Sequence, residues 1–277
     1  MTETDLRDVI ASFPDERARA LYQHGLDRQW NVDRALDWSA LRLDRVPITA
    51  RRGMACLYSD TLHAEKFGLE LGARIAELAP AGWLRDFTLL QLRDEVRHVD
   101  FFGRVVGKLG EGDAISDELV CIRSELLTVT THEELMLHAL ILECGARATF
   151  VGNAKRSLDM VGKGVRLPAN ESISTLMRAI VDYVGRDEAR HIAMGMCCLR
   201  TSLQGPRVSE LRSIERRLRV TATLFLRSLL HRSDTFARLG LSPDTIGTSV
   251  WQAIRSQLQR LDLDIGDPDS APPSAST

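Results

Sequence analysis

The chain has 277 residues, of which 44% are hydrophobic and 27% charged, a composition typical of a globular protein with a sizeable core. A formal net charge of -2 argues against nucleic-acid binding, and no run of about 18 apolar residues predicts a membrane span. The acidic N-terminus lacks the apolar segment of a signal peptide, and the five cysteines contain no Cys-x-x-Cys pair, so we expect a cytoplasmic protein with free thiols.

Apolar residues recur with the helical period along most of the chain, and no segment alternates apolar and polar residues long enough to predict a strand. We therefore expect an all-α protein. The first 46 residues contain short helical pieces and three large apolar side chains, Phe13, Trp30 and Trp38, which we expect to pack across the following helices. Four core helices are predicted over about residues 49–78, 83–107, 132–161 and 171–203.

Several local signals mark the ends of these helices. Pro80 ends the first core helix, and Thr131-His132-Glu133-Glu134 has the spacing of a capping box at the start of the third. The Pro-, Ser- and Asp-rich segment 266–277 is expected to be disordered, which leaves one domain over residues 1–265 with its core at about 49–203. Shorter or additional helices are predicted near residues 115–127, 208–231 and 244–261.

The strongest pattern is a repeated motif: Asp-Glu-Val-Arg-His at 94–98 recurs as Asp-Glu-Ala-Arg-His at 187–191. Because residues three apart share a helix face, Glu95 with His98, and Glu188 with His191, can each direct a carboxylate and an imidazole to one point. One such pair alone is more often a surface ion pair, but its repetition in two core helices favours two halves of a metal site. Four-helix bundles build dinuclear sites from two such pairs and one glutamate of each remaining helix.

Glu65 and Glu143 are the candidates for those two further carboxylates. If the helix at 115–127 crosses the bundle, then Glu65, Glu95, Glu143 and His191 all lie about 11 to 14 residues from the same end, in one layer. Glu143 sits in an apolar run, where an unpartnered carboxylate is costly, and glycines at 68 and 72 leave space beside Glu65. Competing acids lie nearer helix ends or in more polar runs: Glu70, Glu77, Glu133 and Glu134.

Four carboxylates and two neutral imidazoles would balance two divalent cations, and this mixture of oxygen and nitrogen ligands suits iron or manganese. We therefore expect two Fe ions, with an Mn/Fe pair as the alternative, and dioxygen binding at open coordination positions. Asp94 and Asp187 are candidate acceptors for imidazole N–H groups, with Arg97 and Arg190 balancing their charge. Simple ion pairs on the helix surface are an equally good interpretation of these four residues.

At these residues the sequence resembles the ferritin-like diiron-carboxylate superfamily over about residues 50–203. The Asp-Glu-x-Arg-His form is similar to that of bacterial multicomponent monooxygenase hydroxylases, ribonucleotide reductase small subunits and their ligand-binding oxidase relatives. The resemblance implies a ferritin-like four-helix bundle, here with additional N- and C-terminal helices, in which the aspartate of each motif hydrogen-bonds the histidine of the other. It also implies six metal ligands: Glu65, Glu95, His98, Glu143, Glu188 and His191.

Departures from these relatives narrow the expected function. Small subunits that carry a tyrosyl radical place Tyr four residues after the first motif histidine, where this chain has Phe102. Arylamine N-oxygenases add a histidine one turn before the last glutamate, where this chain has Val184. Ferritins are shorter, and rubrerythrins carry an extra Cys-rich iron domain.

We therefore expect an O2-activating dinuclear iron oxygenase or oxidase that acts on a small organic substrate and takes electrons from a reductase or ferredoxin. Two alternatives stay open, since the fold alone does not choose a function. One is a non-enzymatic iron-binding or ferroxidase protein, and the other is a radical generator like the reductase small subunit. A homodimer is compatible with the sequence.

Overall fold

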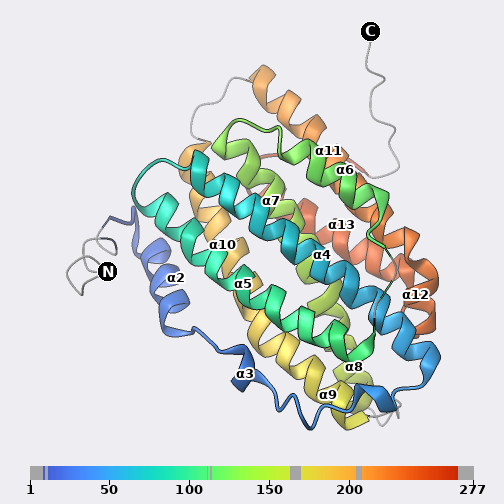
Figure 1. The fold of residues 1–277 in the computed structure, drawn as a ribbon. Helices are drawn as coiled ribbons and strands as arrows, with labels where there is room; N and C mark the ends of the chain where they lie inside the picture. The colour runs from blue at the N-terminus through green and yellow to red at the C-terminus, as the bar shows by residue number, and fades with distance from the viewer. Residues whose placement is uncertain are drawn as a thin grey trace.

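The structure is a computed structural model that describes residues 9, 12–110, 112, 114–162, 170–203 and 208–267. Within these ranges every regular element is a helix, so the all-α prediction is confirmed. Four long helical segments lie side by side and form the bundle (Figure 1). They are α4 (Ile48–Leu78), α5 (Trp83–Leu109), α7 with its continuation α8 (His132–Ala146 and Gly152–Gly162), and α9 with α10 (Asn170–Ala179 and Gly185–Ser202).

The connection between α5 and α7 returns the chain to the end where α5 begins. It contains α6 (Asp117–Leu126), which packs against α4 and against α11 (Val208–His231). In Figure 1, α5 and α7 consequently run in the same sense, from upper left to lower right. This is the crossing connection that the register argument required, and it brings residues at similar depths of α5 and α7 into one layer.

Two of the core segments contain a π-helical turn, where uninterrupted α-helices were predicted. The turn η2 (Arg147–Val151) joins α7 to α8, and η3 (Ile180–Val184) joins α9 to α10. A π turn inserts a residue into the hydrogen-bond ladder and rotates the following helix face. Both turns lie within one helical turn of a motif or candidate residue, after Glu143 and before Asp187.

The N-terminal segment crosses the bundle as predicted. Its elements, α2 (Glu16–Asp27), α3 (Val32–Ala35) and η1 (Leu43–Arg45), all pack against α5. The predicted anchors contact that helix: the Phe13 ring lies 5.6 Å from Trp83, and the Trp38 ring lies 5.4 Å from Phe101. The last helices are α12 (Ser233–Arg238) and α13 (Pro243–Gln259), and α13 packs against α7 and η2.

The prediction of a capping box at the start of α7 is wrong, because its hydrogen bonds are not formed. Thr131 occupies the N-cap position, but its side chain makes no capping hydrogen bond. Glu134, the other half of the motif, instead pairs with Arg217 of α11 and lies 3.6 Å from His138 Nε2. Because α11 packs against α7, Arg217 is available to pair with the glutamate that the local pattern assigned to the cap.

The helical run His132–Asp159 is long and apolar enough to cross a membrane by length and composition, and its most apolar 18-residue stretch has a mean hydropathy of 1.3. It is the single such run among the described residues, and 67% of that stretch is buried inside the structure. Burial within the bundle accounts for this apolar composition. Most of the segment predicted to be disordered, from residue 268 on, lies outside the described residues.

Buried apolar side chains form two clusters at different depths along the bundle. Along α5, the first cluster includes Phe87 and Leu90, and the second begins at Phe101. Along α10 and the turn before it, the second cluster ends at Val184 and the first begins at Met194. The repeated motif falls between the clusters on both helices, so its polar side chains share one buried layer.

Candidate metal centre

The structure brings the six predicted side chains together in that layer. Glu65 comes from α4 and Glu143 from α7, and each motif supplies one glutamate and one histidine. Five of them are buried, and Glu143 is the most open, with 16% of its side chain exposed. Burial of four carboxylates at one place is unfavourable unless cations or protons balance their charge.

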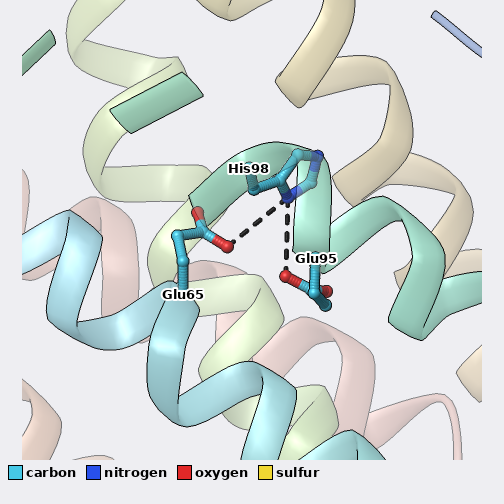
Figure 2. A group of neighbouring side chains, drawn as sticks. All are labelled: Glu65, Glu95 and His98. Atoms are coloured by element: carbon cyan, nitrogen blue, oxygen red, sulfur yellow. Dashed lines mark ion pairs between the residues drawn. The ribbon is translucent and has the colours of Figure 1, made fainter. Parts of the chain in front are cut away.

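The first group comprises Glu65, Glu95 and His98, and Figure 2 shows their side chains pointing toward one another from α4 and α5. His98 Nδ1 lies 3.4 Å from Glu65 Oε2 and 3.5 Å from Glu95 Oε2. Glu188 Oε1 approaches the same nitrogen at 3.4 Å. One potential ligand atom of each of the first three residues lies within 4.8 Å of the others, which is a separation that a single metal ion can span.

The second group comprises Glu95, Glu143 and His191. His191 Nδ1 lies 3.3 Å from Glu95 Oε1 and 3.5 Å from Glu143 Oε2. Glu95 therefore offers one carboxylate oxygen to each group. A carboxylate shared in this way can bridge two metal ions, so the geometry fits a dinuclear site.

Unsatisfied polar atoms give a further test of this fit. Both ring nitrogens of His98, His191 Nδ1 and Glu188 Oε2 are buried and have no hydrogen-bond partner among the described residues. Buried polar atoms in native proteins almost always have a partner, so orphaned atoms need an explanation. Metal ligation supplies one for the two Nδ1 atoms, because these are the nitrogens that face the carboxylates of the ligand groups.

The pKa directions point the same way. Burial raises the pKa of Glu65 to about 8 and also raises that of Glu188, where the Glu143 carboxylate adds to the effect. Burial alone would raise the pKa of Glu95, but hydrogen bonding to His98 and the charge of His191 lower it to about 2. The site thus has more carboxylates than imidazolium groups to balance them. Some of the carboxylates therefore retain protons, which a divalent cation would displace.

A second ring of buried charges orients the imidazoles. His191 Nε2 lies 3.1 Å from Asp94 Oδ2, and His98 Nε2 lies 3.5 Å from Asp187 Oδ2, so each aspartate contacts the histidine of the other motif. Arg190 binds both aspartates. These contacts lie inside the bundle, which rules out the interpretation of the motif residues as surface ion pairs.

Two residues near the centre were not predicted as parts of the site. Gln91 Nε2 donates to Glu143 Oε1 at 2.5 Å, and Trp30 Nε1 donates to Asp187 Oδ2 at 2.7 Å. Gln91 lies one turn before Glu95, so the helical period could have placed it on the same face. Trp30 and Asp187 are 157 residues apart, and nothing in the sequence pairs them.

A cavity of about 70 Å³ adjoins the carboxylates. Its apolar lining comes from α4, α6, α7 and α11, and includes both glycines that were predicted to leave space beside Glu65, Gly68 and Gly72. Leu119 and Phe225 contribute to its lining from α6 and α11. Glutamates of both ligand groups face it: Glu65, Glu95, Glu143 and Glu188.

No protein-family model and no curated protein sequence matches this chain. Solved structures match it in fold. The dimanganese(II) form of NrdF from Streptococcus sanguinis superposes with a TM-score of 0.72 at 12% identity, covering 94% of this chain and 93% of that one. A variant of an R2-like ligand-binding oxidase with an Mn/Fe cofactor gives 0.64 at 16% identity, covering 91% of this chain and 95% of the other.

Another variant of that oxidase, with an Fe/Fe cofactor, gives a TM-score of 0.53 at 15% identity over the same shares of the two chains. At these identities the likeness establishes the fold, a ferritin-like helical bundle with added terminal helices, as the sequence predicted. These similar structures hold manganese, iron or both, and this chain has two carboxylate–imidazole groups able to hold a metal ion.

Proposed function

We propose that the chain is an oxidoreductase that holds two iron ions, or one manganese and one iron ion, and uses dioxygen to oxidise a small organic molecule. The observation that carries the proposal is the junction of two ligand groups, joined through Glu95, with an apolar cavity. Oxygen and nitrogen ligands in this ratio favour iron and manganese. Bound there in the reduced state, these metals supply the electrons that activate dioxygen.

The protein's own residues would position the reactants. The apolar lining of the cavity excludes water and accepts an uncharged part of a substrate, and its volume of about 70 Å³ limits that part to a small group. Gln91 holds the Glu143 carboxylate through its 2.5 Å hydrogen bond. Asp94 and Asp187 fix the imidazole rings so that each Nδ1 faces the ligand groups.

One contact favours a second candidate function, a generator of a protein radical. Trp30 donates to Asp187, which contacts His98, and the Trp30 and His98 rings stack with centroids 6.3 Å apart. An oxidisable indole so close to a metal ligand could pass single electrons between the centre and the surface. The same route would serve an external electron donor, such as a reductase or ferredoxin, in the first function.

The test begins with the metal-free protein, loaded without oxygen with Fe(II), or with Mn(II) and Fe(II), and freed of excess metal. We expect about two metal ions per chain and a transient absorption on exposure to air. Retention of both ions through repeated cycles of reduction and aeration supports an oxidase. Accumulation of ferric iron beyond two ions per chain supports iron handling, and one zinc with no iron or manganese contradicts the proposal.

A further inference from the structure

A groove of about 330 Å³ lies on the far side of α7 and α10 from the candidate metal centre. Cys144 and Ile192 line it, and they directly follow Glu143 and His191, whose side chains face the centre. Elements α2 and α13 pack against these helices and complete its walls.

Four arginines from four different elements line this groove: Arg17 of α2, Arg147 of η2, Arg200 of α10 and Arg260 at the C-terminal end of α13. No aspartate or glutamate of the described residues lines it. Like charges gathered at one place repel one another, so a site built in this way favours binding of an anion.

None of the four guanidinium groups has an ion-pair partner in the part of the chain that the structure describes. Arg260 donates to the neutral Gln257 at 3.2 Å, and the Nε of Arg147 is buried without a hydrogen-bond partner. Some arginines on other faces are ion-paired, such as Arg123, which pairs with Glu70 at 2.6 Å. The groove thus combines four positive charges with unused hydrogen-bond donors.

The environment of Cys197, which lines the groove, indicates how near two of these charges lie. Burial raises the pKa of the Cys197 thiol, while the charges of Arg17 and Arg200 act against that rise. The Asp15 carboxylate, which accepts a 2.7 Å hydrogen bond from Ala18 N as the N-cap of α2, acts on the same thiol and adds to the rise. Arg17 and Arg200 therefore both lie near Cys197.

The floor of the groove is apolar and consists of side chains from α7, η2 and α10, among them Ala148, Ile192 and Met196. A bare inorganic ion would leave this surface unused. An organic anion would cover the floor with its carbon skeleton and present its charged groups to the arginines, and about 330 Å³ is the size of a small-molecule pocket.

We propose that this groove binds a small organic molecule with at least two negative charges, held by Arg17, Arg147, Arg200 and Arg260 above the apolar floor. The planar guanidinium matches phosphate and carboxylate oxygens equally well in bidentate geometry. Phosphate esters and dicarboxylates therefore share the required chemistry. The site is separate from the candidate metal centre, and its occupancy does not depend on the proposed function.

Isothermal titration calorimetry of the full chain, metal-free and metal-loaded, tests the proposal with phenyl phosphate, phthalate and inorganic pyrophosphate. We expect one site per chain, tighter binding of an aromatic anion than of pyrophosphate, and weaker binding at high salt. Arg200→Gln and Arg260→Gln should each raise the Kd about tenfold or more, because each removes a charge-assisted contact. Arg93→Gln, at an exposed arginine of α5, is the matched control and should leave the Kd unchanged.

The outcomes separate clearly, because Arg200 and Arg260 are exposed and their substitution should leave the fold intact, as thermal unfolding would verify. A preference for phenyl phosphate over phthalate identifies a phosphate ester as the ligand class, and the reverse identifies a dicarboxylate. Absence of saturable binding of all three anions up to about 10 mM overturns the proposal. A loss of affinity in Arg93→Gln equal to that in Arg200→Gln also overturns it. Tighter binding of pyrophosphate than of both aromatic anions refutes the role of the apolar floor.

Discussion

Substitution of Glu143 by glutamine removes one negative charge from the second ligand group and keeps the size of the side chain. Glu143 Oε2 lies 3.5 Å from His191 Nδ1, and its Oε1 accepts a hydrogen bond from Gln91 Nε2 at 2.5 Å. A glutamine retains an oxygen that can accept from Gln91. Glu143→Gln therefore tests charge and ligation with little change in packing.

The expected loss of metal affinity follows from the charge removed. Two unit charges about 4 Å apart attract by about 4 kcal/mol at an effective dielectric constant of 20. Because about 1.4 kcal/mol corresponds to a factor of ten, metal affinity should fall on the order of a thousandfold. Without metal, the substitution relieves the repulsion by which Glu143, after burial itself, helps to raise the pKa of Glu188, but it also removes the attraction that, against the effect of burial, raises the pKa of His191. These two effects oppose each other, so the stability of the metal-free variant should change less than its metal affinity.

Metal content after dialysis against a weak chelator, together with thermal unfolding of the metal-free proteins, measures both effects. Glu188→Gln should lose metal as strongly as Glu143→Gln. Glu134→Gln is the matched control on the same helix, because Glu134 pairs with Arg217 and lies 3.6 Å from His138, away from the centre. If Glu134→Gln lost the metal and Glu143→Gln kept it, the assignment of carboxylates to the site would be refuted.

Three other predictions use the site's titration, its aromatic neighbours and its cavity. Metal-free protein should lose stability as pH rises from about 6.5 to 9. His191, with a pKa of about 9, and Glu65, with a pKa of about 8, bind protons more tightly when folded, and His191 alone contributes on the order of 3 kcal/mol. Thermal unfolding that is flat or rises over this range would contradict the assignment. Oxygenation of the reduced protein should give no lasting tyrosyl electron-spin-resonance signal, because Phe102 follows His98 by one turn, and Tyr58, which stacks on Phe102, donates its hydroxyl to the thioether sulfur of Met177 at 3.7 Å. A persistent radical lost in Tyr58→Phe or Tyr183→Phe would show otherwise. Gly68→Leu should keep both metal ions but abolish substrate oxidation, since its side chain would enter the cavity beside Glu95; metal analysis and oxygen uptake would check this, and unchanged turnover would exclude the cavity as the substrate site.

The helices and the depth of the candidate site could be predicted because both follow from the regular α-helix. A predicted helix at 49–78 corresponds to α4 at Ile48–Leu78, and the spacing within the first motif correctly paired Glu95 with His98. In the second motif Glu188 instead lies beside His98, and His191 lies beside Glu95 and Glu143. Depth could be counted across helices since the rise per residue is nearly constant. That count selected Glu143 over Glu134, and the structure brings Glu143 to His191.

Features that depend on contacts across the bundle could not be predicted. The amino-acid composition at 147–151 and 180–184 does not predict π turns. Such a turn depends on how the helix packs against its neighbours rather than on local helix propensity. Glu134 pairs with an arginine of α11 instead of forming the expected capping interaction, and the local sequence cannot reveal this partner. The contact of Trp30 with Asp187 joins segments whose proximity is a property of the finished fold.

The two rings of charge explain why the centre should require metal. In the outer ring, Asp94 and Asp187 are balanced by Arg97 and Arg190, which bind them inside the bundle. The outer ring therefore has no net charge, and it cannot balance the negative charge of the inner ring.

The inner ring holds four carboxylates and two imidazoles, so without cations it must take up protons, as the raised pKa values of Glu65 and His191 indicate. Two divalent cations would neutralise the four carboxylates and leave both imidazoles uncharged. Metal binding should therefore release protons and stabilise the bundle, since the cations replace the protons that balance the buried carboxylates.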